Sequence, residues 1–152
     1  MAGFDRLTPE GRRFFAQMDE LKKMSVHVGY QAGEATSDDG VDMCDIAMWN
    51  ELGTESTPAR PFLRKSMDEN GEKIGAFCQS EIQKVAQGGT AQSALEALGV
   101  FGKGLVQEKI STGDFEPNAP STIRKKGSDK PLIDTGRLRQ SVNYVIKPKG
   151  GD

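Results

Sequence analysis

The chain has 152 residues, of which 36% are hydrophobic and 28% are charged, and its formal net charge at pH 7 is −2. This length suits one domain with a modest core, so we expect residues 1–152 to form a single domain. No apolar run approaches the roughly 20 residues that cross a bilayer, and the N-terminus lacks the layout of a secretory signal. We therefore expect synthesis in a cytoplasm and no membrane partner.

The near-neutral net charge hides an asymmetry along the chain. Residues 117–152 contain eight basic and three acidic side chains, whereas residues 1–116 contain twelve basic and nineteen acidic ones. Oppositely charged portions suit complementary contact between copies of a chain or with neighbouring subunits. This pattern favours assembly over general nucleic-acid binding.

Residues that usually bind metals are few. The single histidine, His27, cannot build the usual zinc or iron sites, and the acidic residues between Glu34 and Asp45 lack the spacing of a calcium loop. Cys44 and Cys78 lie in apolar helical patterns, where cysteine packs as a small hydrophobic residue. We expect no metal, no cofactor, no disulfide, and His27 on the outward side of a strand.

The first predicted elements are a helix and a strand. Thr8 and Pro9 form a good helix start, and the helix should run to about Lys23. Its apolar face is formed by Phe14, Met18 and Leu21. Residues 25–30 alternate between apolar and polar side chains, which predicts the first strand, and residues 31–41 form a flexible loop or hairpin tip.

A second helix begins after Asp42, which can cap it, and ends at Gly53. One face is shared by Met43, Ile46, Ala47 and Asn50, with Trp49 beside it. Residues 54–61 are too rich in proline and polar residues to be regular. They deliver Phe62 and Leu63 to the core.

Two longer helices are expected next. The apolar positions Met67, Ile74, Phe77, Cys78, Ile82 and Val85 predict a third helix that ends at Gly88 and Gly89. Thr90 caps a fourth, with Ala94, Leu98, Phe101 and Leu105 on one face. Because Gly99, Gly102 and Gly104 each cost about 1 kcal/mol relative to Ala, either this helix breaks or a neighbour packs against its backbone.

Residues 112–130 show no periodicity and contain the basic run Arg124, Lys125 and Lys126. A loop of this length is unusual in a compact domain, and we interpret it as a flexible contact arm. Binding of nucleic acid is a weaker alternative, since no aromatic residues are interleaved for stacking. A short helix over residues 136–140, a strand that includes Tyr144, and a tail over residues 147–152 complete the chain.

The motif Asp134-Thr135-Gly136 admits two interpretations. In an aspartic protease such a carboxylate needs a second one opposite it, sharing a proton. Only residues 137–152 follow the motif here, and the long charged Arg137 stands where a small residue is typical. We therefore favour a cap, in which Asp134 or Thr135 accepts from the amides at the start of the short helix. Proteolysis is the disfavoured alternative.

The order of these elements is not the alternating pattern of a parallel sheet. It predicts an α+β fold with a small antiparallel sheet packed against several helices, joined by long loops. Further short strands at residues 60–64 or within residues 31–41 would complete the sheet.

Several blocks of sequence, in this order, resemble the neck or tail-completion proteins of tailed bacteriophages, which are also described as tail-component or minor tail proteins. The blocks are Val26–Tyr30, Ile46–Thr54, Pro58–Arg64, Pro120–Gly127 and Pro131–Leu138. The resemblance spans residues 26–146, and its specificity comes from the order of the blocks.

This resemblance implies a non-enzymatic virion protein at the head–tail junction or the top of the tail, made in the cytoplasm of the host bacterium. Copies would form a homo-oligomeric ring around the tail axis that helps to join tail to head and lets DNA pass. Neighbouring neck, head-closure and tail proteins would be its partners. A tail terminator ring, and an assembly factor absent from the virion, stay open as alternatives.

The residues expected at subunit interfaces are aromatic or charged. Trp49 is the best anchor if it is exposed, because Trp and Arg dominate assembly interfaces, but it can equally belong to the core. Arg60 and Arg64 can bridge to an acidic loop of a neighbour. The full set of candidates is Trp49, Glu51, Arg60, Arg64, Arg124, Lys125, Lys126, Arg137 and Arg139.

Overall fold

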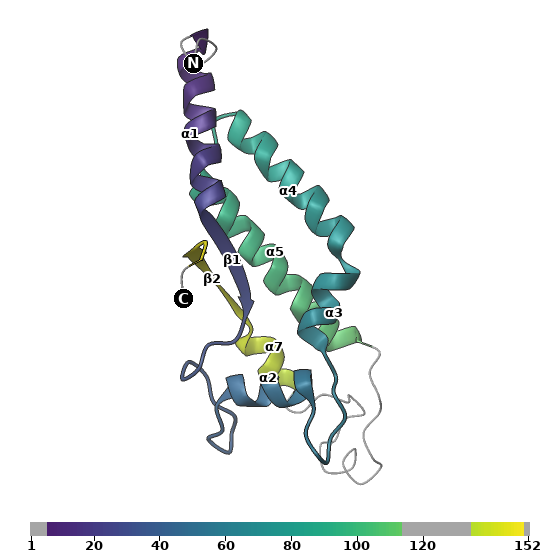
Figure 1. The fold of residues 1–152 in the computed structure, drawn as a ribbon. Helices are drawn as coiled ribbons and strands as arrows, with labels where there is room; N and C mark the ends of the chain where they lie inside the picture. Colours follow the sequence, from purple (N-terminus) through teal and green to yellow (C-terminus); the bar gives the residue numbers. More distant parts are fainter. Residues whose placement is uncertain (1–5, 114–134, 151–152) are drawn as a thin grey trace. The chain divides into compact units, whose positions relative to one another are not determined.

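The computed structural model describes residues 6–113 and 135–150. Its elements in chain order are α1 (Pro9–Lys23), β1 (Met24–Gly29), α2 (Met43–Leu52), α3 (Phe62–Glu69), α4 (Gly71–Ala86), α5 (Ala91–Thr112), α7 (Thr135–Ser141) and β2 (Asn143–Pro148) (Figure 1). Within the described ranges, six helices accompany a two-stranded antiparallel sheet, so the predicted α+β class is confirmed.

The chain groups into two compact units. The first comprises Met1–Val28, Gly71–Gly102 and Tyr144–Asp152, and the second comprises Gly29–Asn70 and Lys103–Asn143. Helix α5 contributes its N-terminal half to the first unit and its C-terminal half to the second. That the chain behaves as one domain stays a prediction.

In the first unit, α1 supplies polar contacts that hold the α4–α5 connection. The helix begins as predicted, with the Thr8 hydroxyl accepting from the Gly11 amide at 3.0 Å. The Arg13 guanidinium donates to the carbonyls of Gly88 and Gly89, just after α4 ends. The Gln17 side chain accepts from the Ala91 amide, the first of α5, at 2.7 Å. Side chains of α1 thus hold the turn after α4 and satisfy the first amide of α5.

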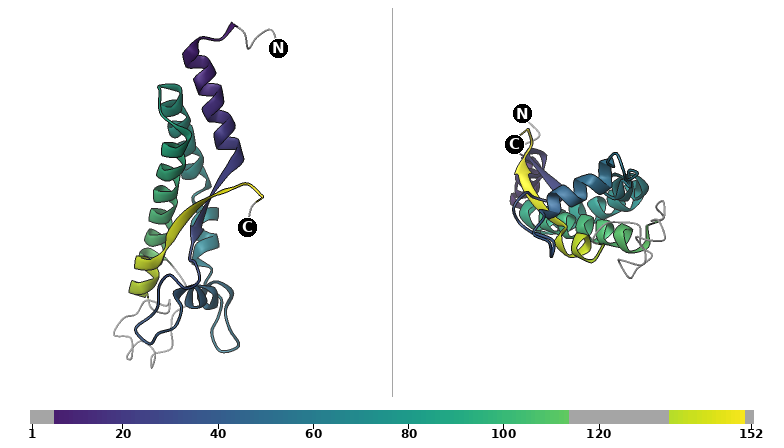
Figure 2. Two further views of the ribbon diagram at one scale, coloured as in Figure 1. Left: turned by 90° about the vertical axis from the view of Figure 1, so that its left-hand side faces the viewer. Right: turned by 90° about the horizontal axis from the view of Figure 1, so that it is seen from below.

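The two strands pair at the end of α1. The Lys149 amide donates to the Lys23 carbonyl at 2.7 Å, and the Ser25 hydroxyl donates to the Lys147 carbonyl at 3.4 Å. Figure 2 shows β1 and β2 as neighbours. The side chain of His27 is exposed on β1, as predicted, with its Nε2 2.9 Å from the Ser25 hydroxyl.

The glycines of α5 let this sheet approach the helix. A Cβ at Gly99 would collide with the ring of Tyr144, and one at Gly102 would lie 2.9 Å from a methyl group of Val28. Nothing lies within 4 Å of a Cβ at Gly104. Helix α5 runs unbroken from Ala91 to Thr112. Of the two explanations for its glycines, packing of a neighbour against the backbone is therefore correct at Gly99 and Gly102.

The second unit has its core beneath α2. All four residues predicted to share a face are buried: Met43, Ile46, Ala47 and Asn50. The Asp42 carboxylate caps the helix by accepting from the Cys44 amide at 2.9 Å, and Gly53 ends it with φ of +80°. The other buried residues of this core include Phe62, Val106, Ile110, Leu138 and Val142.

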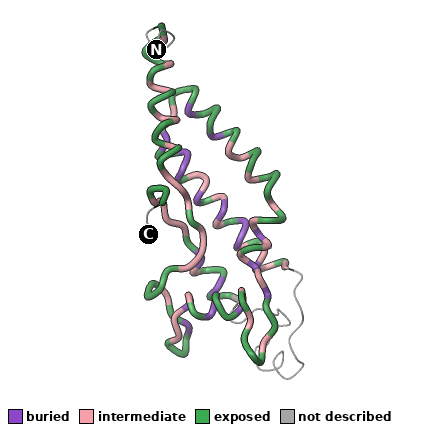
Figure 3. Tube along the Cα trace, in the orientation of Figure 1, coloured by how far each residue is buried: buried purple, intermediate pink, exposed green. Residues whose placement is uncertain are grey.

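Two predictions about the middle of the chain are wrong. The long third helix is in fact two helices, α3 and α4, separated at Asn70. Residues 60–64 do not form a strand, because α3 begins at Phe62, where the Glu51 carboxylate accepts from the Leu63 amide at 2.7 Å. Residues 31–41 contain no strand either. They form a mostly exposed loop closed by a single antiparallel bridge between Thr36 and Asp42 (Figure 3).

Candidate assembly surface

The outward side of α2 carries large apolar side chains in contact with solvent. Met48 is 48% exposed, Trp49 39% and Leu52 71%. Together with the exposed Asp45, these residues follow the spacing of one helical face. We call Asp45, Met48, Trp49 and Leu52 the α2 ridge. Grouped exposed apolar side chains of this kind mark interaction surfaces.

The ridge lies on a firmly held helix. The buried Asn50 donates from its side chain to the Ile46 carbonyl at 2.9 Å, and its own carbonyl accepts from the Arg60 amide at 2.6 Å. A Cβ at Gly53 would lie 2.8 Å from the Ala59 nitrogen, so the chain turns back tightly after α2. An interaction surface held in place before binding loses less conformational entropy when a partner docks.

Two candidate residues near the ridge have different environments from those expected. Arg60 is only 4% exposed, so it does not present its charge to a neighbouring subunit. Arg64 is exposed and can do so. Glu51 is half-buried and uses its carboxylate to cap α3. Arg60 and Arg64 therefore do not act as a matched surface pair.

The basic candidates of α7 are both exposed. Arg137 forms an ion pair with Asp38 of the 31–41 loop, and the carbonyl of Arg139 accepts from the Gln107 side chain at 3.0 Å. Thr135 and Gly136 lie in the first turn of α7. Arg124, Lys125 and Lys126 lie outside the described residues, as do Asp134 with its predicted cap and most of the 112–130 arm.

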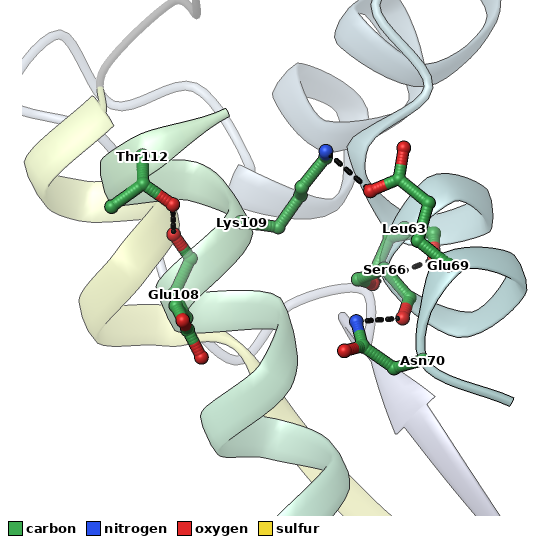
Figure 4. Close-up of polar contacts among 7 residues, drawn as sticks. All are labelled: Leu63, Ser66, Glu69, Asn70, Glu108, Lys109 and Thr112. Atoms are coloured by element: carbon green, nitrogen blue, oxygen red, sulfur yellow. Dashed lines mark hydrogen bonds and ion pairs between the residues drawn. The ribbon is translucent and has the colours of Figure 1, made fainter. Parts of the chain in front are cut away.

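A polar cluster joins α3 to the C-terminal half of α5 (Figure 4). The Lys109 ammonium lies 2.6 Å from the Glu69 carboxylate, and this hydrogen bond lowers the pKa of Glu69. The Asn70 side chain donates to the Ser66 carbonyl at 2.7 Å. A hollow of about 240 Å³ lies beside them. The Lys109–Glu69 pair ties α3 to α5, whereas the Asn70 contact is local to the end of α3, and both suit a structural role.

A larger cavity of about 430 Å³ lies in the first unit. Its walls come from α1, β1, α4, α5 and the residue after β2. We call it the α1–α4–α5 groove, and the residues that line it include Leu21, Lys22, Glu81, Ile82, Leu95 and Lys149. Ile82 is 38% exposed, so solvent reaches the groove. Its volume falls in the range of about 300–1,000 Å³ that is usual for binding pockets.

The carboxylate of Glu81 is the unusual group of this groove. Its side chain is 9% exposed, and among the described residues its Oε2 has no hydrogen-bond donor. The Lys84 ammonium lies 2.9 Å away, which is an ion-pair distance, but its geometry is not that of a hydrogen bond. Lys84 is 67% exposed, so solvent competes for its charge and weakens this ion pair.

The described residues form neither a metal-ion cluster nor a membrane-spanning helix. Within residues 6–113 and 135–150, no three His, Cys, Asp or Glu side chains gather closely enough to hold a metal ion. Over the same ranges, no helix has the length and apolarity needed to cross a bilayer. Comparison of the chain with known protein families, with characterised proteins and with solved structures finds no match.

Proposed function

We propose that the chain is a structural subunit of a tailed-bacteriophage virion, a neck or tail-completion protein that forms a ring at the head–tail junction. Its role is to join tail to head through contacts with neighbouring neck, head-closure and tail proteins, while DNA passes through the ring. The proposal includes no catalytic residue and no cofactor.

One observation carries this proposal furthest. The α2 ridge exposes Met48, Trp49 and Leu52, and these residues fall in the middle of Ile46–Thr54, a block on which the resemblance to phage neck proteins rests. A Trp on an exposed helix face suits the anchor of a protein–protein interface. The opposite net charges of residues 1–116 and 117–152 add complementary surfaces for the same purpose.

The test uses the virus that encodes the chain. Mass spectrometry of purified virions should detect the protein at several copies per particle, and electron microscopy with a labelled chain should place it at the junction. Trp49→Asp should leave filled heads and free tails that do not join, while the wild-type gene supplied in trans restores joining. Absence from purified virions would overturn the proposal and favour an assembly factor.

A further inference from the structure

We propose that the α2 ridge of one copy docks into the α1–α4–α5 groove of a second copy, so that the chain associates head to tail with itself. This inference rests on the proposed function in one respect, since it names the surfaces through which the subunits of a ring would meet. The two surfaces lie in different compact units of the chain.

The groove is shaped to receive apolar side chains. Leu21, Leu95 and Ile82 line it from three different helices, and side chains of the described residues leave a volume of about 430 Å³ there. Because removing apolar surface from water is favourable, an apolar occupant that fits the groove would bind there favourably. The occupant must come from outside the walls, and α2 carries three large apolar side chains that are between 39% and 71% exposed.

The polar groups of the two surfaces are complementary as well. The groove contains the buried Glu81 carboxylate, whose Oε2 has no hydrogen-bond donor among the described residues and whose ion-pair partner at 2.9 Å, Lys84, is 67% exposed. The ridge contains the Trp49 indole, whose N–H can only donate and has no acceptor among those residues. Insertion of Trp49 beside Glu81 would bring a free donor to an acceptor inside an apolar site, where such a bond is worth most.

Charges at the margins agree in sign with this docking. Lys22 and Lys149 line the groove, and Asp45 lies on the exposed face of the ridge, about one helical turn before Met48 and Trp49. An acidic residue beside the inserted apolar group would thus meet basic residues at the groove. Such pairs add little affinity when exposed, but they orient the partner and exclude the reverse docking.

This contact is heterologous, because the ridge and the groove are different surfaces. In a pair of copies one ridge and one groove then stay free, and repetition gives a ring if the rotation closes or a filament if it does not. Three side chains cannot bury the roughly 1,200 Å² of a stable interface, so the ridge serves as the anchor of a larger contact.

The decisive experiment pairs two variants that each damage one surface. Trp49→Asp places a charge on the ridge and leaves the groove intact. Ile82→Lys places a charge in the groove and leaves the ridge intact. Both positions are partly exposed, so the substitutions leave the core in place. Light scattering after size exclusion should show oligomers for the wild type, monomers for each variant alone, and dimers when the two are mixed, because only one intact pair remains.

A matched control uses another exposed apolar residue. Val100 is 60% exposed on α5 and does not line the groove, so Val100→Asp should associate as the wild type does. The inference is overturned if the mixed variants stay monomeric, if Val100→Asp has the same effect, or if the wild type is monomeric at all concentrations. The protein's presence in virions, measured separately, decides the proposed function whatever this experiment shows.

A thiol already present in the groove gives a second test. Cys78 lines it, so Leu52→Cys in a Cys44→Ser background should form disulfides between chains under mild oxidation and give a ladder on a non-reducing gel. Adding Cys78→Ser should abolish the ladder. Asp68→Cys, exposed on α3, is the control that should not link. A disulfide formed only within single chains would overturn the inference.

Discussion

At the scale of single residues, Tyr30 has the clearest energetic role. Its hydroxyl donates to the carbonyl of the fully buried Leu138 at 2.6 Å, which joins the end of β1 to α7 within the second unit. Tyr30→Phe leaves that carbonyl without its donor. We expect a loss of about 1–2 kcal/mol in the free energy of unfolding at neutral pH, measured by urea denaturation. An unchanged midpoint would show that the bond contributes nothing.

The same residue should make stability depend on alkaline pH. Burial raises the pKa of the Tyr30 hydroxyl above its ordinary value, because the phenolate would lose hydration. An unfolded tyrosine ionises near pH ~10, so the contribution of Tyr30 is fully present below that pH and is lost as the pH rises towards the folded-state pKa. Tyr30→Phe should therefore show a smaller fall in stability above pH ~10 than the wild type.

Glu69 gives the opposite sign at acid pH. The hydrogen bond from Lys109 lowers its pKa, so its contribution to stability is present above the unfolded value of about 4.3 and is lost as the pH falls through the folded-state pKa. Glu69→Gln should be less stable than the wild type at neutral pH, and the difference should vanish in strong acid. Glu72→Gln, an exposed control on α4, should not reproduce this pattern.

At the scale of elements, the glycines of α5 determine how closely the sheet packs against this helix. Gly99→Ala improves helix propensity by about 1 kcal/mol but drives a methyl group into the ring of Tyr144. We expect a net loss of about 1–3 kcal/mol from overpacking. Gly104→Ala meets open space and should gain up to about 1 kcal/mol. Opposite shifts in melting temperature would support this account, and a stabilised Gly99→Ala would contradict it.

The elements that sequence predicted well depend on local signals. Thr8 and Asp42 cap the helices that they were expected to cap, and Gly53 ends α2 with a positive φ. Each of these features is decided within a few residues along the chain. The buried face of α2 follows from periodicity for the same reason, since helical spacing alone determines which side chains lie together.

The errors arose where spacing was ambiguous or contacts were distant. Met67 and Ile74 are seven residues apart, about two helical turns, so the apolar pattern stays in phase across the break at Asn70. Asn followed by Gly was the available turn signal. The burial of Arg60 and the existence of the groove depend on how helices distant in sequence approach one another, and no local pattern reports that distance.

At the scale of the whole molecule, the pairing of ridge and groove should respond unequally to apolar and charged substitutions. Trp49→Ala removes the anchor and should raise the Kd for self-association by about 30-fold or more, the effect of a ~2 kcal/mol interface anchor. Asp45→Lys affects an exposed charge and should raise it by about fivefold or less, corresponding to at most ~1 kcal/mol. Sedimentation equilibrium over a concentration series measures both values.

Charge exchange then tests whether Asp45 faces the groove of another copy. Lys22→Glu alone should weaken association, as Asp45→Lys does, because each places like charges opposite one another. A chain that carries both substitutions restores opposite signs across the proposed contact and should recover most of the wild-type affinity. The recovery should shrink at high salt, where the Debye length falls to about 3 Å at 1 M. If the losses of affinity from the two substitutions simply add in the double variant, Asp45 and Lys22 do not face one another across the contact. That result would contradict this orientation of the ridge.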